Sequence, residues 1–327
     1  MNAGNMGPAA YACSAAAYIR HNRAMGLRFR GVEQVLSALG RYLKAAGAPD
    51  LDDARYESWC HSRHLLHSNS RRKAEQIVHK FCVFRQRTEP AIFVPSPATY
   101  SRLKPYVRPV IVEPEQIVRV LAAADTLYSG GRYPLRAAVA RIATVLLYTS
   151  GLRSGELLRL RVEDIEEDGS VLRIRDSKFH KSRLVPLSPS AQLELLRYVE
   201  QRAAVAVRSP DKGPLLCNRY GGKLSPYRPT GFYHMIRDLL STAGVRDLEG
   251  RRPRVHDLRH SFAVQALIRS YREQGDPQAL LPKLALYMGH VSIESTLHYL
   301  RLVPAVAALA SARFDTHFGQ HILGDPL

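Results

Sequence analysis

The sequence predicts a mainly α-helical protein of two domains, in which the second domain also contains a small β-sheet. Three observations support this fold class. Apolar residues recur at helical steps of three and four over residues 9–89. A proline-rich stretch follows from residue 90 to residue 114. Short alternating or β-branched runs at 171–175 and 184–187 then enclose a polar turn, a pattern typical of a β-hairpin.

Residues 1–94 are expected to form a small all-helical domain. Leu36, Leu39 and Leu43 share one face of a helix, which can pack against neighbouring helices. The prolines within residues 95–112 favour an extended linker over a packed element, because proline lacks a backbone donor and restricts the chain. Residues 113–327 are expected to form the second domain, which ends in a C-terminal tail.

Basic residues follow a polar run inside the first domain. The run Ser68–Ser70 is typical of a helix N-cap, and the three residues after it are all basic. Positive side chains oppose the helix dipole at this end, so a role facing phosphate is favoured over a local stabilising role. Further basic residues in the linker would suit a segment that runs along a phosphate backbone. The candidate contacts in this part of the chain are Arg71, Arg72, Lys73, Arg102 and Lys104.

The overall charge indicates a polyanionic partner. The chain has 47 Lys and Arg against 29 Asp and Glu, a net charge of +18, and such a surface attracts nucleic acids. RNA, a membrane surface, or a solvated basic face with no specific partner would be compatible with the same charge. Motifs must therefore decide between these alternatives.

Neither a membrane span nor a secretion signal is expected. The longest apolar run, residues 137–147, is interrupted by Arg141 and is too short for a bilayer. The N-terminus lacks the basic start and apolar core of a signal peptide, so a cytoplasmic protein is expected. The four cysteines are scattered without a paired spacing, which indicates neither a zinc site nor a disulfide framework.

The second domain is expected to be helical on either side of its hairpin. Helical patterning runs to Tyr148 and ends at Ser150 and Gly151. After the hairpin, helical patterning resumes at Pro189, with a Gly- and Pro-rich interruption at residues 210–229.

Two arginines of this domain have well-defined local settings. Arg153, in GLRSGELL, follows Gly151 in a tight turn before a helix that begins at Ser154. His256 and Arg259, in HDLRH, are three residues apart and share a helix face. The planar fork of arginine matches two phosphate oxygens and stays charged at any working pH. Because His256 and Arg259 share a helix face, a proton-transfer group and a cation would point in the same direction.

The segment GHVSIESTLHY carries a further histidine and a candidate nucleophile. Gly289 is expected to end one helix before His290, and Ser292 to cap the next helix, with Tyr299 near its end. Tyrosine has an ordinary pKa of about 10, so it needs neighbouring cations or a base to act as a nucleophile.

In sequence order, these residues resemble the arginine, histidine-x-x-arginine, histidine, tyrosine series of the tyrosine recombinases, the phage integrase family. That family also carries a catalytic lysine on the turn of a β-hairpin, and SKFHKSRLVPL, residues 177–187, resembles this hairpin. Lys178 occupies the matching place. Lys181 and Arg183 compete with it, and both are otherwise candidate DNA contacts.

The resemblance covers residues 113–300 as a catalytic domain, and residues 9–89 fit the family's helical core-binding domain in character. It implies a DNA-binding helical domain followed by an α+β catalytic domain. The stretch between Arg259 and His290 is longer than in compact family members. This stretch and the tail after Tyr299 look closer to recombinases of transposons and other mobile elements. Double-stranded DNA with specific sites and a homotetramer on two duplexes are the implied partners. The tail from residue 302 either docks on a neighbouring protomer or folds back on its own core.

The resemblance also implies a mechanism. The tyrosine attacks the scissile phosphate to give a 3′-phosphotyrosyl link, while the two arginines and the second histidine hold the non-bridging oxygens. The lysine protonates the leaving 5′-oxygen, and the first histidine exchanges the tyrosine proton. Neither a metal ion, ATP nor another cofactor is required. The implied catalytic residues are Arg153, Lys178, His256, Arg259, His290 and Tyr299.

Each residue alone permits a simpler interpretation. Arg153 and Glu156 have the spacing of a helical ion pair, His256 and His260 have the spacing of metal ligands, and Tyr287 rivals the later tyrosine as nucleophile. The whole chain could also bind DNA without cutting it, or relax supercoils as a type IB topoisomerase. The complete series in the right order favours a recombinase.

Overall fold

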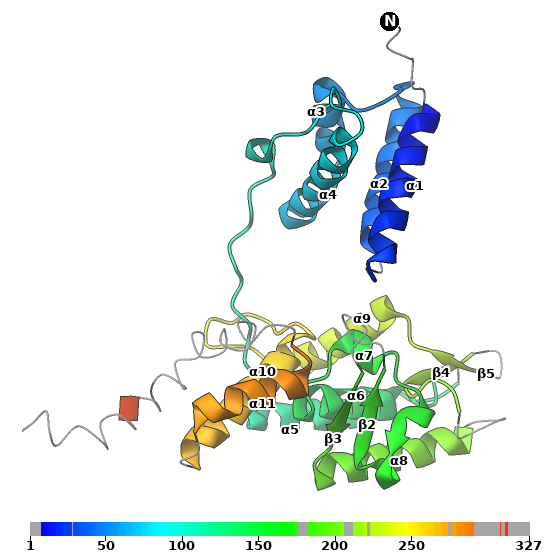
Figure 1. The fold of residues 1–327 in the computed structure, drawn as a ribbon. Helices are drawn as coiled ribbons and strands as arrows, with labels where there is room; N and C mark the ends of the chain where they lie inside the picture. The colour runs from blue at the N-terminus through cyan, green and yellow to red at the C-terminus, as the bar shows by residue number, and fades with distance from the viewer. Residues whose placement is uncertain are drawn as a thin grey trace, which may run out of the picture. The chain divides into compact units, whose positions relative to one another are not determined.

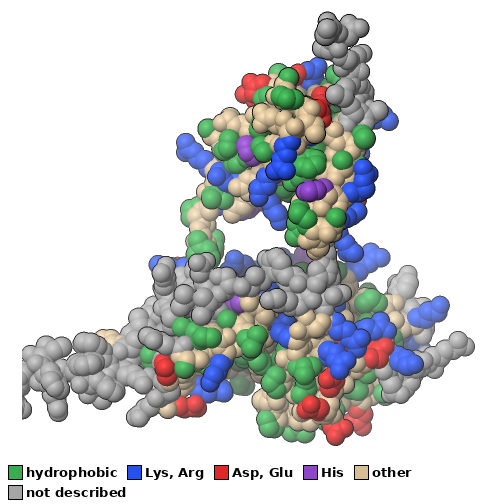
Figure 2. Space-filling model, in the orientation of Figure 1, with side chains coloured by type: hydrophobic (Ala, Val, Ile, Leu, Met, Phe, Trp, Pro, Cys, Tyr) green, Lys and Arg blue, Asp and Glu red, His purple; other side chains and the backbone are tan. Residues whose placement is uncertain are grey.

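The computed structural model describes residues 8–27, 29–131, 133–175, 182–205, 212–220, 223–273 and 276–290, with Ala308, Ser311 and Ala312. The chain divides into two compact units, residues 1–107 and residues 108–327. Figure 1 traces their helices and strands, and Figure 2 shows Lys and Arg side chains spread over both units. Every described helix is too short or too polar to cross a membrane.

The first unit is built from helices, as the sequence predicts. Leu36, Leu39 and Leu43 are buried on one face of the second helix. Tyr11 packs edge-on against Phe81, with 5.6 Å between ring centroids, so aromatic residues fill the space between the helices. The described helices of this unit are α1 (Pro8–Ala24), α2 (Arg30–Ala45), α3 (Asp53–Ser62), α4 (Ser68–Gln86) and the short 3₁₀ helix η1 (Pro97–Thr99).

Helix α4 begins earlier than the sequence predicts. Its N-cap is His67, whose side chain accepts a hydrogen bond from the backbone N–H of Asn69. The residues predicted as the cap, Ser68–Ser70, form the first turn instead, and Arg71–Lys73 lie one turn further along. The predicted cap is therefore wrong, and the opposition of these charges to the helix dipole is weaker than expected, because the dipole's effect falls off beyond the first turn.

The start of the predicted linker is held against α4 up to Ser101, whereas residues 102–108 are exposed and form neither helix nor strand. Glu75, which is buried, accepts hydrogen bonds from the backbone N–H and hydroxyl of Ser101 at 2.7 and 2.6 Å. Arg72 donates to the Ser101 carbonyl at 3.0 Å, and its guanidinium lies over the Tyr100 ring. These contacts fix the start of the segment on α4, because a buried carboxylate needs its donors.

The second unit combines helices with two small antiparallel sheets (Figure 1). In the three-stranded sheet, β2 pairs with β3 so that Ile174 faces Arg183, which confirms the predicted hairpin. Its helices are α5 (Pro114–Asp125), α6 (Arg136–Thr149), α7 (Ser154–Leu157), α8 (Pro189–Val205), α9 (Pro229–Thr242), α10 (Asp257–Arg272) and α11 (Pro277–Met288), with 3₁₀ helices η2 (Val162–Asp164) and η3 (Glu167–Gly169). Its strands are β1 (Ile165–Glu166), β2 (Val171–Ile174), β3 (Arg183–Pro186), β4 (Cys217–Tyr220) and β5 (Lys223–Pro226).

Helix α6 lies at the centre of this unit. Val139, Ala143 and Leu146 are fully buried on it, and α5, α8 and α10 pack around it. A helix that is apolar on nearly all sides is stable only when other elements surround it. The turn that follows α6 is therefore held from several directions.

The strands β4 and β5 correct the interpretation of residues 210–229 as an irregular interruption. They form a hairpin in which Tyr220 faces Lys223, leaving two residues between the strands. Those residues are Gly221 and Gly222 in the sequence, and a two-glycine connection is a known hairpin signal.

The start of the second unit is fastened to α10. The backbone N–H of Val110 donates to the carboxylate of Asp257, and that of Val112 donates to the hydroxyl of Ser261 at 2.8 Å. Asp257 and Ser261 are both buried. The backbone at Val110 and Val112 thus supplies hydrogen-bond donors to these buried polar groups, which positions α10 within its unit.

Candidate active site

Arg153 stands in the tight turn that the sequence predicts between two helices. Helix α6 ends at Thr149, and Gly151 turns the chain with a φ of 58°. A Cβ atom at Gly151 would collide with the ring of Phe262, so both the backbone angle and the space require glycine here. Arg153 then caps α7 from an extended conformation.

Glu156 lies at the centre of an arginine network. Its carboxylate accepts from the backbone N–H and Nη1 of Arg153 at 3.0 and 2.8 Å. Arg183 donates to both of its oxygens at 3.1 and 2.9 Å. Burial opposes ionisation of Glu156, but the hydrogen bonds and charge of Arg183 and Arg153 outweigh it and lower its pKa to about 2. The ion pair between Arg153 and Glu156 that the spacing indicates is therefore present, as part of a larger network.

Arg259 connects the segments that carry the other predicted catalytic residues. It is 1% exposed, and its guanidinium donates to the carbonyls of Gly151 and Met288, the latter at 2.7 Å. These carbonyls lie two residues before Arg153 and His290. Arg153 itself donates to the Gly289 carbonyl at 2.8 Å. Segments more than a hundred residues apart are thus joined around two guanidinium groups.

His290 follows directly on the end of α11. Gly289 has a φ of 66°, and the N–H of His290 donates to the Ala285 carbonyl at 2.9 Å, which closes the helix as predicted. Burial, together with the positive charges of Arg259 and Arg153, lowers the pKa of His290 to about 4. His290 is consequently neutral at pH 7.

His256 lies at the start of α10, beside His260. The two rings meet edge to face, with 4.7 Å between their centroids. Desolvation and the charge of Arg259 lower the pKa of His256, and the pKa of His260 falls to about 4 by burial and the neighbouring His256. Both rings are neutral at pH 7, so His256 can accept a proton.

The pair of His256 and His260 and the rival tyrosine Tyr287 are the residues behind the metal and alternative-nucleophile interpretations. No group of three His, Cys, Asp or Glu side chains within the described ranges is arranged to hold a metal ion. Tyr287 stacks on Phe262 at 5.5 Å, donates its hydroxyl to the Pro186 carbonyl, and has a pKa raised to about 12 by burial. Tyr287 is therefore held in place by packing and by its own hydrogen bond.

The structure brings together Arg153, His256, Arg259 and His290, whereas Lys178, Lys181 and Tyr299 lie outside the described residues. The predicted phosphate contacts of the first unit differ in environment. Arg71 is half-buried and Arg72 is bound to its own chain, whereas Lys73, Arg102 and Lys104 are exposed.

Sequence reasoning misplaced Arg183. It was expected to contact DNA or to replace the hairpin lysine, but its side chain is only 12% exposed and is bound to Glu156 inside the protein. For Glu156, the sequence predicts only a helical ion pair with Arg153. No local pattern predicts the contact between Arg183 and Glu156, because it joins positions 27 residues apart.

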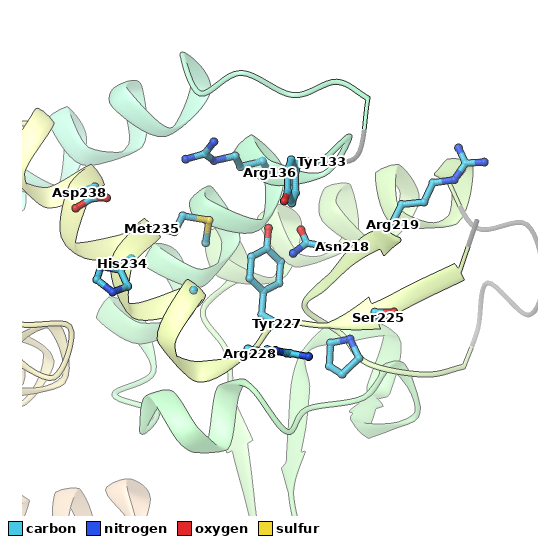
Figure 3. Close-up of a pocket in the computed structure, with 12 residues that line it drawn as sticks. Tyr133, Arg136, Asn218, Arg219, Ser225, Tyr227, Arg228, His234, Met235 and Asp238 are labelled. Carbon is cyan, nitrogen blue, oxygen red and sulfur yellow. The ribbon is translucent and has the colours of Figure 1, made fainter. Parts of the chain in front are cut away.

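A pocket of about 730 Å³ lies elsewhere in the second unit, between the start of α6, the β4–β5 hairpin and the start of α9 (Figure 3). Tyr227 stands at its centre, with its hydroxyl toward Tyr133 and Arg136. None of the four assembled catalytic candidates lines it. The candidate site is thus defined by its arginines and histidines and not by this cavity.

Comparison with known proteins identifies the family. Residues 111–305 match the model of the phage integrase family. The chain is 30% identical over 301 residues to the "Putative integrase/recombinase y4rB" of Sinorhizobium fredii, covering 91% of this chain and 95% of that protein. It is 31% identical over 157 residues to the tyrosine recombinase XerC of Chromobacterium violaceum, covering 48% and 46%.

Solved structures share the fold. The Tn1549 transposon integrase in complex with transposon right end DNA aligns with a TM-score of 0.61 and 17% identity, covering 93% of this chain and 98% of that one. The XerH site-specific recombinase bound to a palindromic difH substrate aligns with a TM-score of 0.60 and 17% identity, covering 87% and 78%. With the arginine and histidine series assembled in one place, this chain belongs to the phage integrase family, the tyrosine-type site-specific DNA recombinases.

Proposed function

We propose that this recombinase cleaves and rejoins DNA through a covalent bond between Tyr299 and a 3′-phosphate. The observation that supports the proposal is the convergence of Arg153, Arg259 and His290, tied together through neighbouring backbone carbonyls. Two guanidinium groups and a neutral imidazole are suited to holding the oxygens of one phosphate.

The proposed reaction proceeds in two balanced steps. The phenolic oxygen of Tyr299 bonds to phosphorus, its proton passes to the neutral His256, and the bond from phosphorus to the 5′-oxygen breaks. Lys178 gives a proton to that oxygen, leaving a 5′-hydroxyl. In the second step, a 5′-hydroxyl of the partner strand bonds to phosphorus and gives its proton to Lys178, while the bond from phosphorus to the Tyr299 oxygen breaks and that oxygen regains its proton from His256. Because the phosphotyrosyl bond conserves the energy of the broken phosphodiester bond, neither ATP, a metal ion nor another cofactor is needed.

The proposed partner is double-stranded DNA that carries specific recombination sites. The net charge of +18 supports this proposal, as do the two fold relatives, whose structures are complexes with transposon right end DNA and with a palindromic difH substrate. By analogy with the family, four protomers act on two duplexes. The resemblance to transposon recombinases makes a mobile element the proposed setting.

A nicked suicide substrate tests the proposed activity. Cleavage near the nick releases a short fragment, so the covalent protein–DNA adduct accumulates and survives denaturing gel electrophoresis. The wild-type protein is expected to form this adduct at its cognate site. Tyr299→Phe removes the nucleophilic oxygen and is expected to abolish the adduct while leaving DNA affinity within a few-fold of wild type.

Two other results would favour the rival functions. Retardation of the DNA by the wild-type protein without an adduct would indicate a protein that binds without cutting. Relaxation of supercoils at many sites, without strand exchange, would indicate a topoisomerase.

A further inference from the structure

We propose that Arg183 is a positioning residue, which holds the Gly289–His290 turn against the Glu156–Arg153 pair and so sets His290 for catalysis. This inference rests on the proposed function, since it concerns how one member of the proposed catalytic set is placed. It adds a residue that lies on β3, outside the six residues of the proposed catalytic set.

The contacts of Arg183 lead in two directions. Its Nη1 and Nη2 donate to both oxygens of Glu156, and its Nε donates to the Tyr287 carbonyl at 2.9 Å. Tyr287 lies three residues before His290, in the last turn of α11. One planar side chain therefore joins the end of α11 to the carboxylate that also binds Arg153.

Close packing restricts this arrangement further. A Cβ atom at Gly289 would lie 3.0 Å from Nη1 of Arg183, so the guanidinium rests directly against the turn that precedes His290. The side chain of Glu156 is 1% exposed, and that of Arg183 is 12% exposed. Water cannot easily replace such a buried pair, and removing one partner leaves the other unsatisfied.

Arginine is required by this geometry, because lysine cannot reproduce it. An ammonium group can approach one oxygen of Glu156, but it cannot make parallel bonds to both oxygens and also reach the Tyr287 carbonyl. The substitution Arg183→Lys should therefore keep the charge and loosen the turn, whereas Arg183→Gln should lose both.

A double-mutant cycle on the full-length protein tests the proposal. The rate of adduct formation on the suicide substrate is measured for wild type, Arg183→Gln, His290→Ala and the double variant. We expect Arg183→Gln to slow the reaction about 10- to 100-fold in the wild-type background and less than about 3-fold in the His290→Ala background, because coupled residues are non-additive. Arg183→Lys should give a smaller loss with the same dependence on His290.

Arg173→Gln is the matched control. Arg173 lies on the adjacent strand β2 and pairs with Glu166, but its side chain is 50% exposed. Its loss should leave adduct formation within a few-fold of wild type, because an exposed pair contributes little. A rate for Arg183→Gln equal to that of wild type, or an equal loss in both backgrounds, would overturn the proposal.

The titration of His290 gives a readout that does not depend on activity. Arg183 is one of the charges that lower the pKa of His290, so in Arg183→Gln the pKa should rise toward its ordinary value, as followed by NMR. An unchanged titration would also count against the proposal. If Arg183→Gln does not fold, the same cycle with Arg183→Lys decides the question, because this variant keeps the charge and loses only the fork. Absence of an adduct with the wild-type protein would instead refute the proposed function, and the titration would still report on Arg183.

Discussion

The guanidinium of Arg153 binds two groups of the protein and still has donors that could bind a ligand. It donates to Glu156 and to the Gly289 carbonyl, which uses two of the five N–H donors of the side chain. Its side chain remains 24% exposed, in contrast to the fully enclosed Glu156. A residue held in this way is preorganised, because its orientation does not have to be found when the phosphate arrives.

Arg153→Lys tests whether the fork is needed. Lysine keeps the positive charge but cannot bind Glu156, the turn and a phosphate together, so adduct formation should fall by roughly 100-fold or more, as for the loss of one transition-state donor. DNA affinity should stay within a few-fold in a binding assay. Arg159→Lys, an exposed arginine in the next turn, is the control. Activity of Arg153→Lys within a few-fold of wild type would exclude the clamp role.

At the scale of elements, the site is assembled from the ends of helices. Arg153 follows the end of α6, His256 precedes α10, and His290 follows α11. Helix ends leave carbonyl groups without partners inside the helix. Arg259 donates hydrogen bonds to carbonyls at two such ends, those of Gly151 and Met288. The same bonds that complete these ends therefore bring the catalytic candidates together.

Gly151→Ala tests the turn after α6. The substitution places a side chain in the left-handed region, at a cost of about 1–2 kcal/mol, and it forces the Phe262 ring to move, at a further cost of about 1–3 kcal/mol. Gly244→Ala is the matched control, because Gly244 has a φ of 65° with nothing within 4 Å of its Cβ position. Urea unfolding should therefore show a larger loss of stability for Gly151→Ala. Equal losses would mean that the contact with Phe262 costs nothing.

Local patterns predicted the elements, and long-range contacts explain what was missed. The buried face of α2, the β2–β3 hairpin and the glycine ends before Arg153 and His290 follow from spacing within a few residues. The internal role of Arg183 does not, because its carboxylate partner and its carbonyl partner belong to distant segments. The β4–β5 hairpin could have been found from Gly221 and Gly222, but the surrounding glycine and proline content favoured a loop.

For the molecule as a whole, the neutral histidines make stability depend on pH. His260 and His290 have pKa values of about 4 in the folded protein, below their ordinary value of about 6.5. Between these values the unfolded chain binds more protons than the folded chain, so the free energy of unfolding should fall as the pH drops from about 6.5 toward 4. Glu156, with a pKa of about 2, should add to the loss only below pH 4.5.

Unfolding in urea at pH 7 and pH 5 measures this dependence. A loss of roughly 2–4 kcal/mol is expected for the unit that contains the site. His260→Asn removes one of the two groups and should reduce the difference between the two pH values. Equal stability at pH 7 and pH 5 would contradict neutral, buried histidines.

The most direct test of the whole account is to identify the residue that becomes linked to DNA. The adduct from the suicide substrate is digested with nuclease and protease, and the peptide that retains a nucleotide is sequenced by mass spectrometry. The account predicts a phosphotyrosyl link at Tyr299 in the wild-type protein. A link at Tyr287 or at any other side chain, or an adduct that persists in Tyr299→Phe, would contradict it.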